Sequence, residues 1–180
     1  MKKITLLTIL MVLPFLTFAQ GPWEFNTDGD TEGWTKTNSS ALIVSGGLIT
    51  LTPTGNNPKL LQAAAGIDPA TVQHIHITVI NNTSNEYMRV SYPKNTTGGR
   101  AYKNIVILPN TGSTTYDIDL SGTFWNTNLG ALINDIQIHI KGAGNTDAAQ
   151  DGTVQFDSII VDNNTTLSVD TFETTKFSVF

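Results

Sequence analysis

The stretch Trp23-Glu24-Phe25-Asn26-Thr27-Asp28-Gly29-Asp30-Thr31-Glu32-Gly33-Trp34 places acids and glycines between aromatic residues. Its acids Asp28, Asp30 and Glu32 stand at every second position, and carboxylates in such a Gly-rich turn can surround a hard cation with oxygen atoms. The flanking aromatic residues predict that the turn is attached to a hydrophobic core. A second segment with a similar pattern of acidic and then apolar residues, residues 151–162, lies at the end of the folded region. We expect the two segments to form the first and last strands of one β domain.

Residues 1–19 have the pattern of a secretory signal peptide. A basic start at Lys2 and Lys3 precedes an apolar run over residues 4–18, which is short for a membrane span and is interrupted by Pro14. The small residue Ala19 favours cleavage before Gln20. An uncleaved membrane anchor is the alternative. We therefore expect a secreted or cell-surface protein with no membrane insertion after cleavage.

The charge of the mature chain argues against a polyanionic partner. Without residues 1–19, eight basic and fifteen acidic residues remain, a formal charge of −7. This mildly acidic surface argues against binding nucleic acid or an acidic membrane. The chain has no cysteine, so its stability must come from its core and from any bound ion. Residues 20–162 are enough for one domain and too few for two.

Short alternating segments separated by turn residues run through the domain and predict strands rather than helices. We expect strands over residues 42–44, 48–51, 74–80, 87–92, 102–108, 115–120, 135–141 and 153–161. Only residues 59–66 and 128–132 could hold a helical turn. The predicted fold class is all-β: an antiparallel β-sandwich or jelly roll of about eight or nine strands.

Alternation also assigns polar side chains to one face of three predicted strands. In the segments 74–79, 87–91 and 136–141, the apolar side chains point inward and the polar side chains between them point outward. We interpret the three strands as sharing one polar face. An aromatic ring stacks on sugar C–H groups and arginine donates forked hydrogen bonds, so this face suits carbohydrate binding. The candidate binding residues are His76, Tyr87, Arg89, Gln137 and His139. The alternative is a polar cross-strand ladder without a ligand.

After residue 162 the composition changes. Residues 163–166 read as a linker, and residues 167–180 resemble the entry into the C-terminal sorting domain of type IX secretion substrates, with a Leu-Ser-Val lead and a Phe-Ser-Val-Phe strand. The expected continuation of that pattern does not follow Phe180, so we read residues 163–180 as a linker and the start of a truncated sorting domain. The resemblance implies the type IX secretion machinery as a partner.

Residues 23–162 resemble carbohydrate-binding-module-like domains of the galactose-binding jelly-roll type. The matching segments, in chain order, are residues 25–30, 32–34, 44–48 and 57–58, the run 116–120, Trp125, and residues 156–159. The resemblance implies a secreted, non-catalytic module that binds a polysaccharide or surface glycan. It also implies a structural Ca²⁺, for which Asp157 on the last strand joins Asp28, Asp30 and Glu32 as candidate ligands; turn-capping hydrogen bonds are the alternative role of these acids.

Other functions remain as alternatives. One is a structural or adhesive accessory β-sandwich of a larger exported protein. The pair His74 and His76, followed by Glu86, invites a cupin-like metalloenzyme with His139 as a third ligand, although the spacing is too long for that motif. A glycan-degrading enzyme is a further alternative through Asp117 and Asp119. No catalytic residue is predicted.

Overall fold

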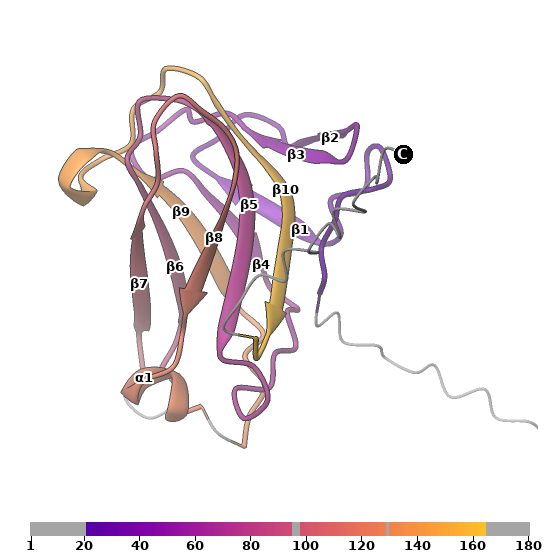
Figure 1. Ribbon diagram of the computed structural model, residues 1–180, viewed down its shortest axis with the longest axis vertical. Helices are drawn as coiled ribbons and strands as arrows, with labels where there is room; N and C mark the ends of the chain where they lie inside the picture. Colours follow the sequence, from indigo (N-terminus) through magenta and orange to yellow (C-terminus); the bar gives the residue numbers. More distant parts are fainter. Residues whose placement is uncertain (1–20, 95–97, 129, 165–180) are drawn as a thin grey trace, which may run out of the picture.

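Two antiparallel five-stranded sheets pack face to face in this computed structural model, which describes residues 21–94, 98–128 and 130–164 (Figure 1). In spatial order, sheet A consists of β2 (Ile43–Ser45), β3 (Leu48–Leu51), β10 (Thr153–Asp162), β5 (His74–Asn82) and β8 (Thr111–Asp119). Sheet B consists of β1 (Trp34–Thr37), β4 (Lys59–Gln62), β9 (Ile136–Lys141), β6 (Tyr87–Pro93) and β7 (Arg100–Val106). The predicted β-sandwich is confirmed, with ten described strands rather than eight or nine.

Helical structure is confined to two short connections in the described ranges, α1 (Thr123–Asn126) and a 3₁₀ turn (Ala143–Asn145). The helical turn that residues 59–66 could hold does not form at β4, because Lys59–Gln62 alternates between the two faces of sheet B. Leu60 and Gln62 are buried on one side, and β4 pairs with both β1 and β9. A four-residue segment with this alternation forms a strand when neighbours are present on both sides.

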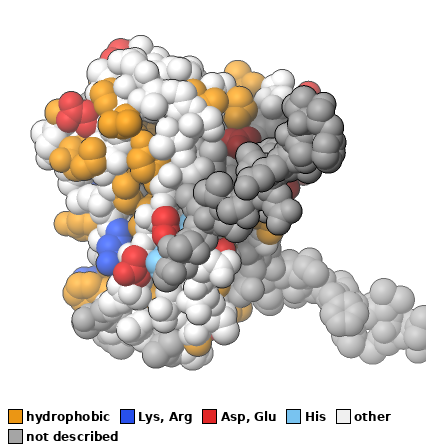
Figure 2. Space-filling view, viewed as in Figure 1, with side chains coloured by type: hydrophobic (Ala, Val, Ile, Leu, Met, Phe, Trp, Pro, Cys, Tyr) orange, Lys and Arg blue, Asp and Glu red, His pale blue; other side chains and the backbone are white. Residues whose placement is uncertain are grey.

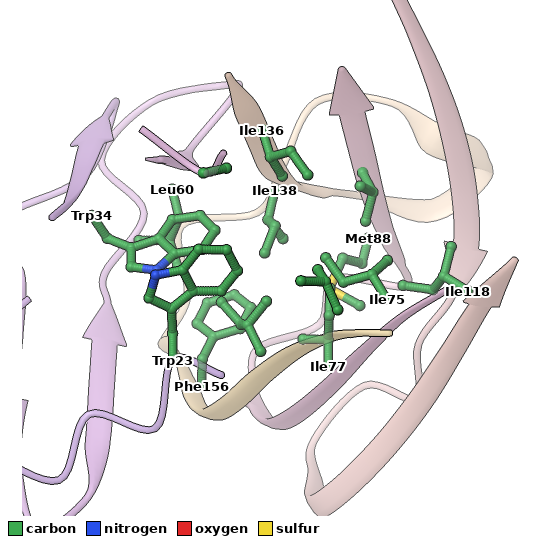
Figure 3. Close-up of a cluster of buried hydrophobic side chains, with 14 of the residues drawn as sticks. Trp23, Trp34, Leu60, Ile75, Ile77, Met88, Ile118, Ile136, Ile138 and Phe156 are labelled. Atoms are coloured by element: carbon green, nitrogen blue, oxygen red, sulfur yellow. The ribbon is translucent and has the colours of Figure 1, made fainter. Parts of the chain in front are cut away.

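The core lies between the two sheets and consists of the inward residues of each strand. Ile75 and Ile77 of β5 face Ile136 and Ile138 of β9, and all four side chains are fully buried. Figure 3 shows these side chains converging with Met88, Ile118 and Phe156 from neighbouring strands. Burial of this apolar area is the main stabilising contribution in a domain without disulfides.

The tryptophans belong to this core. Trp23 and Trp34 cross edge to face, with ring centroids 5.3 Å apart and an interplanar angle of 80° (Figure 3). Trp125 is also fully buried, and its indole N–H donates to the carbonyl of Val72 at 2.8 Å. The aromatic residues of the opening segment therefore anchor it to the sandwich, as the sequence predicted.

The segment from Trp23 to Trp34 is a turn-rich connection rather than a first strand. Only Trp23 pairs with the last strand, through two backbone hydrogen bonds to Ile159 of 2.9 and 3.0 Å. β1 begins later, at Trp34, and lies in the opposite sheet. Gly33 precedes it with φ = +83°, and a Cβ at this position would meet the Gln62 amide at 3.2 Å. Glycine therefore allows the chain to pass from sheet A to sheet B here.

Candidate functional site

The outward side of sheet B, which we call the sheet B face, brings together four of the five predicted binding residues. Register places Arg89 of β6 opposite His139 of β9, with Gln137 two residues along β9. Tyr87 lies opposite Lys141 at the next outward position. The strand alternation assigned to β6 and β9 is thus confirmed, and these side chains share one surface.

An aromatic and a cation meet near the β7 edge of this face. The Arg89 guanidinium carbon lies 4.1 Å from the centre of the Tyr102 ring, and Arg89 Nε donates to Asn104 Oδ1 at 2.8 Å. Tyr102 nevertheless keeps 54% of its surface exposed. The two contacts fix the plane of the guanidinium. Its terminal amino groups have no hydrogen-bond partner in residues 21–94, 98–128 and 130–164, so they remain available to a ligand.

His139 lies at the centre of the face but is only 8% exposed. Its Nδ1 lies 3.0 Å from Asn57 Oδ1, and its Nε2 lies 3.2 Å from Gln137 Oε1. Burial, followed by the charges of Lys59, Arg89, Arg100 and Lys141, lowers the pKa of His139 to about 4. The ring is therefore neutral at pH 7 and has one N–H to donate.

The fifth predicted residue, His76, lies in the other sheet. It belongs to β5, which pairs with β10 and β8 of sheet A, so its side chain faces outward on the opposite side of the sandwich. The interpretation that three strands share one polar face was wrong for this strand. Alternation reports which side of its own strand a residue occupies, and it carries no information on which sheet the strand joins.

His76 instead belongs to a cluster with aspartates on sheet A. Its Nε2 lies 3.0 Å from Asp162 Oδ1, and the neighbouring His74 Nδ1 lies 2.8 Å from Asp117 Oδ1. Figure 2 shows acidic side chains beside histidine on this side of the molecule. Because His139 lies on sheet B, the three histidines do not meet, and the cupin-like alternative lacks its ligand set.

Several residues of the sheet B face were missed from the sequence. Tyr102 and Asn104 come from edge strand β7, whereas Lys59 comes from β4, which is not among the strands predicted from the sequence. The missed signal is the period-two alternation of Tyr102, Asn104 and Val106, which matches that of β6. Lys103 obscures it by placing a charge at an inward position of the edge strand.

The four predicted calcium ligands do not come together as a set. Asp28 Oδ1 accepts the backbone N–H of Gly46, and Asp30 Oδ1 accepts that of Glu32 itself. The Glu32 carboxylate accepts two further backbone N–H groups, from residues 24 and 25. Asp157 lies at a bulge of β10 and lines a different pocket, which it shares with residues 24, 26, 158 and 160. In the described ranges, no three His, Asp or Glu side chains are grouped to hold a metal ion.

The acids of the opening segment accept backbone N–H groups, which favours the turn-capping role over the calcium role, and thermal unfolding tests between the two roles. Because Asp28, Asp30 and Glu32 each already accept at least one backbone N–H, we expect excess EDTA to leave the melting temperature unchanged. The measurement is thermal unfolding of the full chain, monitored by circular dichroism with EDTA and, in a second experiment, with CaCl₂ added back. A melting temperature that falls with EDTA and recovers with calcium would show that an ion does hold this region.

No helix in the described part of the chain is long and apolar enough to cross a membrane. No protein-family model matches the sequence. No curated protein matches it either.

Solved structures similar to this chain include two carbohydrate-binding modules. One is a CBM28 module specific for non-crystalline cellulose, with a TM-score of 0.53 at 15% identity, covering 77% of this chain and 91% of the module. Another is the xylan-binding module CBM15, with a TM-score of 0.53 at 17% identity, covering 76% and 94%. The agarase AgWH50C also matches, with a TM-score of 0.54 at 9% identity, over 79% of this chain and 26% of the agarase. At these identities the likeness establishes the architecture, and the chain has a β-sandwich fold like that of carbohydrate-binding modules.

Proposed function

We propose that this protein is a secreted, non-catalytic module that binds a polysaccharide or surface glycan on the sheet B face. The observation that carries the proposal is the pairing of exposed Tyr102 with the fixed guanidinium of Arg89. An aromatic ring offers a stacking surface for the C–H groups of a sugar ring, and the guanidinium donates to its hydroxyl oxygens.

Further polar groups line up beside this pair across four strands. One outward row runs from Lys59 through His139 and Arg89 to Asn104. The next contains Gln137, Ser91 and Tyr102. Hydroxyl-rich ligands need many such donors and acceptors held at fixed spacing, and a sheet holds them on rigid elements. We propose that the protein binds its glycan without cleaving it.

The similar solved structures support the proposal without defining the sugar. The CBM28 and CBM15 modules are described as binding cellulose and xylan, and they share this architecture. Export through a signal peptide and the type IX route rests on residues 1–19 and 163–180, of which residues 1–19 and 165–180 lie outside the described part of the chain. Both remain proposals.

Replacing Tyr102 with alanine is expected to weaken glycan binding at least tenfold, because the stacking surface is lost while the strand is kept. The measurement is isothermal titration calorimetry against a panel of neutral and acidic oligosaccharides, with Tyr87→Ala as a second variant on the same face. His76→Gln is the matched control, because this residue lies on the opposite sheet. Equal glycan affinities of Tyr102→Ala and wild type would show that the binding site does not lie on the sheet B face. No binding to any glycan would favour the structural or adhesive role.

A further inference from the structure

The charges of this protein are separated between its two sheets. The strands of sheet B contain no acidic residue and carry the basic residues Lys36, Lys59, Arg89, Arg100, Lys103 and Lys141. The strands of sheet A contain no lysine or arginine and carry Asp117, Asp119, Asp157 and Asp162. Although the chain has a negative net charge, the strands of sheet B are therefore basic.

Four of these cations surround His139 on the sheet B face. Lys59 and Arg89 lie opposite it on the two neighbouring strands, and Lys141 lies two residues along β9. The fourth, Arg100, donates to the Asp135 carboxylate and is thereby neutralised. The combined positive field is strong enough to contribute to the lowered pKa of His139.

The remaining three cations have no carboxylate partner in the described ranges. Lys59 donates to the neutral Gln137 amide at 3.1 Å, and Arg89 contacts only Asn104 and Tyr102. Lys141 is 9% exposed. Partly buried cations that repel one another and lack counter-charges are unfavourable, and such costs are retained at functional sites. An anionic ligand on this face would supply the missing counter-charge.

We infer that the ligand of the sheet B face is an acidic glycan, whose sugars carry carboxylate or sulfate groups, rather than a neutral one. The inference rests on the proposed function and adds the chemistry of its ligand. In this arrangement Tyr102 stacks on a sugar ring, while Arg89 and Lys59, on either side of His139, receive its acidic groups. Arginine can bind a carboxylate or sulfate group through two parallel hydrogen bonds, and lysine binds either group as a point charge.

The test compares acidic and neutral oligosaccharides of equal length by isothermal titration calorimetry of the full chain. The acidic probes are oligogalacturonate and alginate oligomers for carboxylates and carrageenan oligomers for sulfates; the neutral probes are xylohexaose and cellohexaose. We expect at least one acidic probe to bind at least tenfold more tightly than both neutral probes. This preference should shrink as NaCl is raised, because salt screens exposed charges. The probe that binds best identifies the acidic group.

The variants Lys59→Gln and Arg89→Gln are each expected to weaken binding of the acidic probe about tenfold. Lys36→Gln removes the same charge from β1 and is expected to have little effect, because Lys36 points to the other side of that strand, where it donates to the Ser39 carbonyl. Tyrosine-dependent binding of neutral probes as tight as that of acidic ones would overturn the inference and leave the proposed function standing. Absence of glycan binding would overturn both. Tighter, lysine-dependent binding of a single-stranded oligonucleotide would also overturn the inference.

Discussion

Replacing Asn85 with alanine is expected to lower the free energy of unfolding by about 3 kcal/mol, because it leaves several buried polar groups without partners. Asn85 is fully buried. Its Oδ1 accepts the Ala149 N–H at 2.8 Å, and its Nδ2 donates to the Ala149 carbonyl and to Thr83 Oγ1. Thr83 Oγ1 in turn donates to Asn81 Oδ1 at 2.6 Å. When one member of such a network is removed, its partners stay buried without a hydrogen bond, and the free-energy cost of burying those polar groups is no longer offset.

The neighbouring Asn82→Ala variant is the matched control. Asn82 is exposed and makes one long contact, 3.4 Å to Gln155 Oε1, so we expect its change to stay within about 0.5 kcal/mol. Urea unfolding at pH 7 measures both variants. Because Asn85 lies just before β6, the variant should also loosen the start of the sheet B face at Tyr87. Equal midpoints for the two variants would show that the network adds little to stability.

Stability is expected to fall between pH 6.5 and pH 4 because of His139. An imidazole in the unfolded chain titrates near pH 6.5, whereas burial and nearby cations lower the pKa of folded His139 to about 4. Between these values the unfolded state binds a proton that the folded state does not. The free energy of unfolding therefore decreases as pH falls through this window, by roughly 3 kcal/mol at pH 4. The contribution is fully present above pH 6.5.

The His139→Gln variant isolates this effect from other titrating groups. Gln keeps a polar side chain beside Asn57 and cannot be protonated, so the variant should lose stability less steeply than wild type below pH 6.5. Urea unfolding at intervals from pH 8 to pH 4 measures the difference between the two profiles. Parallel profiles would contradict a depressed pKa for His139, and with it the positive field on the sheet B face.

Strand alternation in the sequence predicted much of the fold and part of the candidate site. It identified the inward residues of β5, β6 and β9 because those strands are long and regularly alternating. It did not identify β4, where two adjacent leucines are compatible with a helical turn as well as with a strand. The neighbours β1 and β9 decide between the two, and such long-range pairing cannot be read from a local pattern.

The composition of the site depended on the same long-range information. His76 and His139 have equivalent outward positions in their own strands, yet β5 and β9 belong to opposite sheets. Tyr102 becomes part of the site because β7 pairs with β6 and places its ring next to Arg89. The net charge of the chain likewise did not predict the charge of the sheet B face. A total taken over the whole chain does not show that acids and bases occupy different sheets.

The central claim is that the sheet B face binds a glycan, and NMR titration of the ¹⁵N-labelled chain tests it most directly. The probe is the oligosaccharide of the calorimetry panel that binds most tightly, added stepwise at constant pH and salt. We predict that amide shifts concentrate in β4, β9, β6 and β7, and that the Tyr102→Ala variant loses them. Shifts concentrated in β5, β8 and β10, or unchanged by that variant, would contradict the claim.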